Sequence, residues 1–243
     1  MTTLQGGITT SSVSRQDLAN ISEASYGTDI TNNPGAVAIG NAGWTQVGLD
    51  GKPTTAFFTD ALTGFQGAIY TNGTQVVVSY KGSGPTVDDW VYNNLALFTG
   101  QVPPQYYDAL SLYYSVANSS QFSGFDITVT GQSKGGYLAE LVGASTGAIS
   151  NTFNTVGIPP NILSQLNIDP NQSFSNITNY NNSTDALHIA NIALGLNLLG
   201  NSYVIPDNID SNPIDSHRVF DLKVNNKLGI INLKSLNKKR KFL

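Results

Sequence analysis

One segment in the middle of the chain restricts the fold more than any other. Residues 125–146 read FDITVTGQSKGGYLAELVGAST, a β-branched run followed by a serine among glycines and then an apolar pattern with helical spacing. The run predicts a buried strand and the later pattern predicts a helix. A sharp turn at Ser133 must join them, with Gly131 and Gly135 allowing the backbones to pass closely. The segment therefore predicts a unit of strand, tight turn and helix.

The same alternation extends to both sides of this unit. Asn72-Gly73 separates two of the strand-like runs and is typical of a hairpin, so the first strands should be antiparallel. Later strands alternate with helices, which favours parallel pairing. We expect an α/β fold with a mixed, mostly parallel sheet flanked by helices, and a loop at residues 30–43. Strands are expected at 54–59, 64–71, 74–82, 125–132, 151–158, 174–182, 202–206 and 217–224, and helices at 14–27, 86–98, 103–120 and 134–146.

The composition excludes several kinds of chemistry. The chain has no cysteine, so disulfides, thiolate catalysis and cysteine-bound metals are ruled out. Its two histidines make a histidine-rich zinc site improbable on composition alone. Neither a phosphate-binding P-loop nor a dinucleotide-binding glycine motif occurs. We therefore predict no metal and no cofactor.

The charge is unevenly distributed over the 243 residues. The net charge is −4, but the last ten residues hold five basic side chains, and without them seven basic residues face 16 acidic ones, or about −9. An acidic body should not attract nucleic acid. We predict one domain over 1–233 and a basic tail over 234–243 that is disordered. A targeting role, or contact of the tail with an anionic surface, remains open.

No apolar run reaches the length of a membrane span, and the first residues lack the charged and apolar regions of a signal peptide. The low charge and the lack of cysteine suit a secreted bacterial enzyme.

Ser133 is the candidate nucleophile. A serine on a strained strand-to-helix turn can present its hydroxyl where the helix N-terminus favours a developing negative charge. A tight turn without catalysis would give the same pattern. Such a serine needs a general base and an acid that orients the base.

His217 lies in a turn-rich segment and is the candidate base, whereas His188 lies in an apolar run and fits a buried structural role. Asp185 follows a predicted strand and should emerge at the sheet edge that carries Ser133, so it is the candidate acid. Asp207 and Asp210 remain alternatives for the acid. Glu140, Asp169 and Asp215 are less suitable, since they belong to the helix after Ser133, a loop before proline, and a turn beside His217.

The oxyanion of an acyl-transfer intermediate needs two hydrogen-bond donors. The backbone N–H of Lys134 is one candidate. Ser83, in a glycine-rich loop after the strand that ends at Tyr80, is the other. A plain turn or an anion nest is the alternative for that loop.

Together these motifs resemble the class 3 lipases, a fungal-lipase-like branch of the α/β-hydrolases. The matching segments are VVVSYKGS, DDWVYN, VTGQSKGGYLAEL, NTFNTVGIP, SNITNYNNSTD and SHRV, from Val76 to Val219. The resemblance implies that Ser133, Asp185 and His217 form a triad, that Ser83 holds the oxyanion, and that the substrates are acyl esters of glycerides or phospholipids, cleaved without a cofactor.

This sequence departs from the family at three places. Gln132 and Lys134 replace the usual histidine and leucine beside the serine, and Ser83 stands where threonine is more common. The segment between Gly84 and Trp90 is also short for a lid. We therefore expect a serine esterase or lipase that favours short to medium acyl chains and touches lipid surfaces only transiently. Phospholipase A activity and a non-catalytic interaction protein are the alternatives, and the oligomeric state is open.

Overall fold

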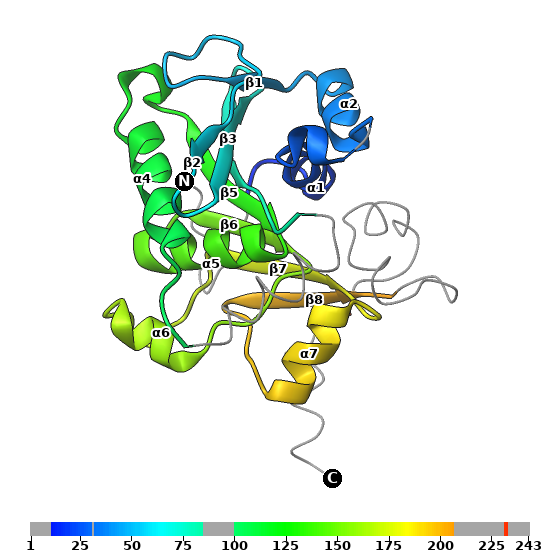
Figure 1. Ribbon diagram of the computed structural model, residues 1–243, viewed down its shortest axis with the longest axis vertical. Coiled ribbons are helices and arrows are strands. Elements are labelled where there is room, and N and C mark those ends of the chain that lie inside the picture. Colours follow the sequence, from blue (N-terminus) through cyan, green and yellow to red (C-terminus); the bar gives the residue numbers. More distant parts are fainter. Residues whose placement is uncertain (1–10, 31, 85–99, 207–230, 233–243) are drawn as a thin grey trace.

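The computed structural model of the protein describes residues 11–30, 32–84, 100–206 and 231–232. Within these ranges nine strands form one sheet in the order β1-β3-β4-β5-β6-β7-β8-β9, with β2 also paired to β3 (Figure 1). The strands are β1 (Thr45–Val47), β2 (Phe58–Asp60), β3 (Phe65–Thr71), β4 (Gln75–Tyr80), β5 (Asp126–Gln132), β6 (Ile149–Phe153), β7 (Ile177–Asn182), β8 (Asn201–Ile205) and β9 (Ile231–Asn232).

The predicted mixed sheet is confirmed. Strands β1 to β4 pair antiparallel, whereas β4 to β8 are parallel neighbours, and β9 returns antiparallel to β8. The hairpin between β3 and β4 turns at Asn72-Gly73, where Gly73 has a φ of 89° that other residues rarely adopt. Because β4 to β8 run in the same direction, their carboxyl ends meet at one edge of the sheet.

Helices cover both faces of the sheet. In Figure 1, α1 and α2 lie on one side and α4 and α5 on the other. At the start of α1, the Ser14 side chain accepts a hydrogen bond from the Asp17 N–H. The α-helices are α1 (Arg15–Ala24), α2 (Pro34–Asn41), α4 (Gln105–Ala117), α5 (Lys134–Thr146), α6 (Pro160–Gln165) and α7 (Ala186–Leu194), with short 3₁₀ turns at Gly27–Asp29 and Ser120–Phe122.

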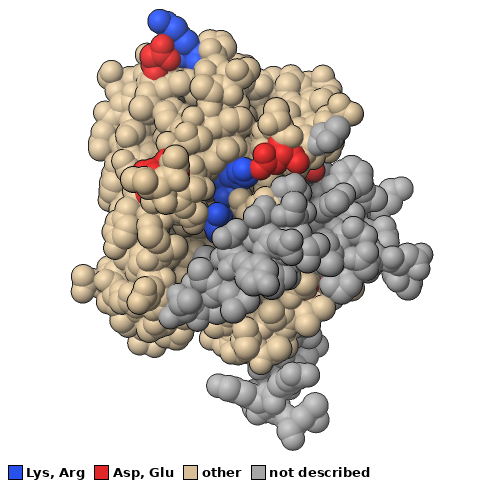
Figure 2. All heavy atoms as spheres, in the orientation of Figure 1, with Lys and Arg blue, Asp and Glu red and all other residues tan. Residues whose placement is uncertain are grey.

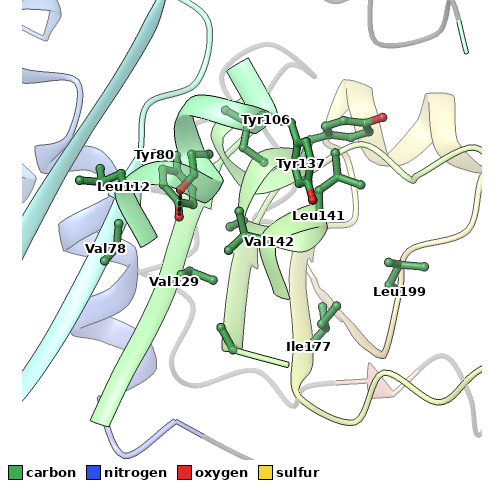
Figure 3. Close-up of a cluster of buried hydrophobic side chains, with 14 of the residues drawn as sticks. Val78, Tyr80, Tyr106, Leu112, Val129, Tyr137, Leu141, Val142, Ile177 and Leu199 are labelled. Atoms are coloured by element: carbon green, nitrogen blue, oxygen red, sulfur yellow. Dashed lines mark hydrogen bonds between the residues drawn. The ribbon is translucent and has the colours of Figure 1, made fainter. Parts of the chain in front are cut away.

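The core divides into two clusters, one on each face, because alternate side chains of a strand point to opposite sides. Val76, Val78 and Tyr80 of β4 pack with α4 and α5, whereas Val77 packs with α1. Figure 3 shows the first cluster, in which Tyr137 and Leu141 of α5 and neighbouring side chains fill the space over the sheet. Helix α5 is thus held on the parallel strands by the central part of the core.

Several predicted boundaries were wrong. Residues 34–41 form α2 instead of a loop, because Asn33 caps the helix and Pro34 begins it. Gly35 allows α2 to press against α1, since a Cβ there would lie 2.5 Å from the Asn20 carbonyl oxygen. The strand expected at 151–158 begins and ends earlier, as β6 at Ile149–Phe153. Of the strand expected at 54–59, only the last two residues belong to β2, which continues to Asp60.

Some predictions lie outside the described residues. They are the helix at 86–98, the strand at 217–224 and the basic tail at 234–243, so the domain boundary at residue 233 stays a prediction. On the face drawn in Figure 2, charged side chains are sparse over the described surface, as the 12% charged content of the chain leads one to expect. Across the described residues, none of the helices combines the length and the apolarity needed to cross a bilayer.

Candidate active site

The turn at Ser133 joins β5 directly to α5. Ser133 has φ 58° and ψ −127°, a left-handed conformation that is strained for a residue with a side chain. Two backbone hydrogen bonds fix it: the Ser133 N–H donates to the Phe153 carbonyl at 3.0 Å, and its carbonyl accepts from the Tyr137 N–H at 3.0 Å. The predicted unit of strand, sharp turn and helix is confirmed.

Three glycines make this turn possible. A Cβ on Gly131 would lie 2.3 Å from the backbone of Gly135, and one on Gly135 would lie 2.0 Å from the carbonyl oxygen of Tyr80. A Cβ on Gly136 would lie 2.9 Å from the Cβ of Thr155. Contacts this short cannot accommodate a methyl group without movement of the backbone. Strands β4 and β5 and the start of α5 therefore pack at backbone distance.

The Ser133 hydroxyl has no hydrogen-bond partner among the described residues, although the side chain is buried. A buried hydroxyl without a partner is rare in a folded protein. It lies at the N-terminus of α5, where Lys134 is the first helical residue and the helix dipole contributes partial positive charge. This combination suits an oxygen that carries negative charge during a reaction.

The candidate oxyanion loop follows β4 and packs against the turn. Ser83 is buried, and a Cβ on Gly82 would lie 2.7 Å from the Gln132 carbonyl oxygen. The Tyr26 hydroxyl donates to Oε1 of Gln132 and is also hydrogen-bonded to the backbone of Gly82. Tyr26 therefore ties the loop to the residue before Ser133.

Burial keeps Tyr26 in its neutral form, because it raises the pKa of the phenol well above the ordinary value. The start of the loop is also anchored by an ion pair between Lys81 and Asp29. Both anchors come from the segment after α1, so this N-terminal segment helps to set the position of Ser83.

Asp185 lies just after β7 and caps α7. Its Oδ1 accepts a hydrogen bond from the His188 N–H at 2.9 Å, and the residue is fully buried. Because β5 and β7 are parallel with β6 between them, Ser133 and Asp185 both lie at the carboxyl edge of the sheet. Asp185 therefore occupies the edge that the sequence predicts.

Of the two histidines, only His188 lies among the described residues. His188 is a buried residue of α7, and burial lowers its pKa although the nearby Asp185 acts in the opposite direction. It is therefore neutral at pH 7, in agreement with the structural role predicted for it. His217, the candidate base, lies outside the described residues, as do Asp207, Asp210 and Asp215.

Buried asparagines, which were not among the residues predicted from the sequence, hold the segments around Asp185. Asn191 of α7 donates to the Thr155 carbonyl at 3.0 Å and accepts from the Gly157 N–H at 2.9 Å. Asn181 accepts from the Thr155 N–H at 3.1 Å. These amides form hydrogen bonds with backbone groups of the loop after β6. The bonds of Asn191 also hold α7 against that loop. An asparagine inside an otherwise apolar helix was the available signal.

Glu140 is the other polar group buried in this region. Its Oε1 accepts from the Leu199 N–H at 2.6 Å and from Asn179 at 3.2 Å, while Oε2 has no partner among the described residues. Burial raises the pKa of this carboxyl to about 8. Its contacts lie with β7 and the segment before β8, which agrees with the expectation that it is less suitable than Asp185 as the acid partner of the base. Asp169 instead accepts from the Asn171 N–H in an exposed turn.

Comparison with known sequences relates the chain to phospholipases. The family model described as Phospholipase-like, the Tle-like phospholipase domain, matches residues 17–200. The extracellular phospholipase A1 of Serratia liquefaciens is 33% identical over 111 residues, which make up 46% of this chain and 33% of that protein. The chain thus spans about a third of the length of this relative.

Solved structures of fungal lipases share the fold. The Rhizomucor miehei lipase in complex with its propeptide superposes with a TM-score of 0.52 at 15% identity, over 87% of this chain and 80% of that one. A lipase of Yarrowia lipolytica superposes with a TM-score of 0.53 at 14% identity, over 83% of this chain and 80% of that one. The predicted α/β-hydrolase fold and the resemblance to class 3 lipases are confirmed.

Proposed function

Because the chain belongs to the Tle-like phospholipase family, whose lipase fold supports ester hydrolysis, we propose that it cleaves acyl esters of phospholipids through a serine nucleophile. The strained backbone and unpartnered hydroxyl of Ser133 carry this proposal. Such strain persists only where the surrounding structure enforces it, and it is common at reactive positions. The name of the Serratia relative, a phospholipase A1, favours a phospholipid substrate.

In the proposed mechanism, Ser133 Oγ attacks the carbonyl carbon of the ester while His217 takes the hydroxyl proton. Asp185 orients the imidazole and stabilises its positive form. The proton then passes to the leaving alcohol, and a water molecule hydrolyses the acyl-enzyme by the reverse sequence of transfers. The N–H of Lys134 and the N–H and hydroxyl of Ser83 stabilise the oxyanion in both steps, each donor contributing about 3 kcal/mol.

The first experiment tests the nucleophile. Ser133→Ala should reduce hydrolysis of p-nitrophenyl butyrate by about 10⁴-fold or more and abolish labelling by a fluorophosphonate probe. Ser22→Ala serves as a control, since Ser22 is a buried serine of α1 that bonds to Thr130. A folded Ser133→Ala protein with full activity would refute the proposal. A wild-type protein that the probe fails to label would favour the non-catalytic alternative.

The second experiment separates the two histidines. His217→Gln should remove activity, whereas His188→Gln should leave most of it, because burial already holds His188 in its neutral form. Asp185→Asn keeps a capping oxygen for α7 and should therefore leave stability nearly unchanged while lowering kcat by about 10⁴-fold. Retained activity in the Asp185→Asn variant would move the role of the acid to Asp207 or Asp210.

The substrate is defined by comparing p-nitrophenyl butyrate, a triglyceride emulsion and phosphatidylcholine vesicles. We expect phosphatidylcholine to be cleaved, and we retain the preference for short to medium acyl chains as part of the proposal. The segment from Pro85 to Phe98 that bears on a lid lies outside the described residues. Activity on butyrate and triglyceride without any on phosphatidylcholine would indicate an esterase or lipase instead.

Helix α7 is the described surface best suited to transient lipid contact. It contains no Asp, Glu, Lys or Arg, and Ile189, Ile192 and Leu194 are exposed on it, Ile192 at 70%. Ile192→Gln should slow hydrolysis of vesicles but not of p-nitrophenyl butyrate. Leu62→Gln is a matched control, because Leu62 is 97% exposed in the turn between β2 and β3. Equal effects of the two variants would exclude a special role for α7.

A further inference from the structure

A pocket lies on the α1 face of the sheet, apart from the turn at Ser133. Helix α1 packs on β4, β5 and β6, and the sheet continues beyond it into β7 and β8 (Figure 1). The pocket occupies the place where the first turn of α1 meets these outer strands and has a volume of about 220 Å³. Its described walls include Ser11, Arg15, Asn151, Thr178, Tyr180 and Tyr203.

The strand register aligns the floor of the pocket in two rows. Asn151, Thr178 and Asn201 are direct neighbours on β6, β7 and β8. Two residues further along the same face, Phe153, Tyr180 and Tyr203 form a second row, with adjacent ring centroids 5.6 Å apart and nearly parallel planes. A polar row thus lies beside an aromatic row.

The polar row contains amide donors without partners. Asn151 is 6% exposed and Asn201 is 8% exposed, and within the described part of the chain neither Nδ2 has a hydrogen-bond acceptor. Burying an amide group without a partner is unfavourable, so such groups in a native protein need an explanation. A bound acceptor in the pocket supplies one for Asn151, which lines it directly.

The charged side chain among the described walls of the pocket, that of Arg15, is basic. The Arg15 guanidinium lies over the Tyr180 ring, 5.5 Å from its centroid, and no acidic residue is among the described walls. Arg15 is also the first residue of α1, where the helix dipole adds partial positive charge. The Thr178 side chain supplies a further hydroxyl, whereas the Ser11 hydroxyl is already hydrogen-bonded to Thr128 Oγ1 at 2.9 Å.

We propose that this pocket is a binding site for a phosphate group, separate from the catalytic serine. Its volume is below the roughly 300–1,000 Å³ of pockets for larger ligands, which limits the bound part to a small oxyanion. Donors from a helix and from neighbouring strands converge on it, and this arrangement fits the several oxygens of a tetrahedral phosphate better than a planar carboxylate. Inorganic phosphate and the phosphate of a lipid head group share this chemistry.

Isothermal titration calorimetry on the full chain with Ser133→Ala tests the proposal without any turnover. Inorganic phosphate, glycerol 3-phosphate, glycerophosphocholine and acetate are compared at constant ionic strength. We expect saturable binding of at least one phosphate compound and weaker binding of acetate. Binding of free phosphate and the monoester would identify these as ligands, while binding of only the diester would identify a lipid head group. No saturable binding of any phosphate compound would overturn the proposal.

Variants localise the binding. Arg15→Gln and Asn151→Leu should each raise the dissociation constant about tenfold or more, as expected for loss of a charged or buried donor. Lys52→Gln is the control, because Lys52 is an exposed basic residue elsewhere on the surface. Asn151→Leu also removes an unpartnered amide, so the free protein should not lose stability. Unchanged affinity in both pocket variants, or an equal loss in the Lys52→Gln protein, would refute the site.

Discussion

Replacing Glu140 by glutamine should remove a large part of the pH dependence of stability. The carboxyl is fully buried on α5, and its pKa rises from the ordinary 4.5 to about 8 because burial disfavours the charged form. The hydrogen bonds from Leu199 and Asn179 act in the opposite direction but are outweighed. At pH 7 the folded protein therefore keeps this proton, whereas the unfolded chain has released it.

The direction and the size of the pH effect on the free energy of unfolding follow from this difference in proton binding. Below pH 4.5 both the folded and the unfolded protein bind the proton, so the contribution of Glu140 to the free energy of unfolding is fully present there. Between pH 4.5 and about 8 only the folded state binds it, and the free energy of unfolding falls by about 1.4 kcal/mol per pH unit. Across this window the loss is about 5 kcal/mol, comparable to the whole stability of a small domain. Above pH 8 the loss is complete.

Urea unfolding, followed by tryptophan fluorescence at several pH values from 4 to 9, measures the effect. The glutamine variant leaves one amide N–H₂ without a partner, which costs about 1–3 kcal/mol at every pH. Only the difference in slope between the two proteins is therefore diagnostic. His188 has a lowered pKa and acts with the opposite sign, but it is present in both proteins and cancels. Asp126→Asn, at an exposed carboxylate, is the control. Parallel stability curves for wild type and Glu140→Gln would refute the reasoning.

Four further changes have clear expected results. Ser133→Gly should be more stable than Ser133→Ala by about 1 kcal/mol in urea unfolding, because the φ of 58° suits glycine. Gly135→Ala should destabilise the protein by about 3 kcal/mol or more, since its Cβ would meet the Tyr80 carbonyl, whereas Gly40→Ala meets no such contact and should not. Tyr26→Phe should lower kcat about tenfold, with little change in KM, because it removes the hydrogen bonds to Gln132 and to the Gly82 backbone that tie the oxyanion loop to the turn at Ser133. Ser83→Ala should lower kcat on p-nitrophenyl butyrate about 10²-fold and Ser83→Thr much less, because threonine keeps the donor.

The local part of the fold was predictable because its signals lie within short stretches. The turn at Ser133 needs glycines at fixed positions, and the helix after it follows the expected residues 134–146. The start of α1 was likewise set by the hydroxyl of Ser14 and the acidic group of Asp17. In each case the cap or the turn belongs to the same segment as the element that it begins.

The rest depended on contacts between distant segments. Helix α2 looked like a loop because it contains two glycines, and its stability comes from the close packing of Gly35 on α1. The roles of Asn191 and Asn181 arise only when β6, β7 and α7 come together. The same holds for Tyr26, which lies 106 residues before its partner Gln132.

The backbone contacts at Gly131, Gly135 and Gly136 also limit how this chain can change. Replacing any of these glycines requires β4, β5 or the loop after β6 to move, whereas replacing Ser133 requires no movement. A descendant of this protein can therefore lose its hydroxyl in one step and keep the fold, but it cannot lose the glycines as easily. We therefore expect relatives that have lost the serine, and with it the reaction with esters, to retain the three glycines. The glycines would then identify such relatives as members of the same family.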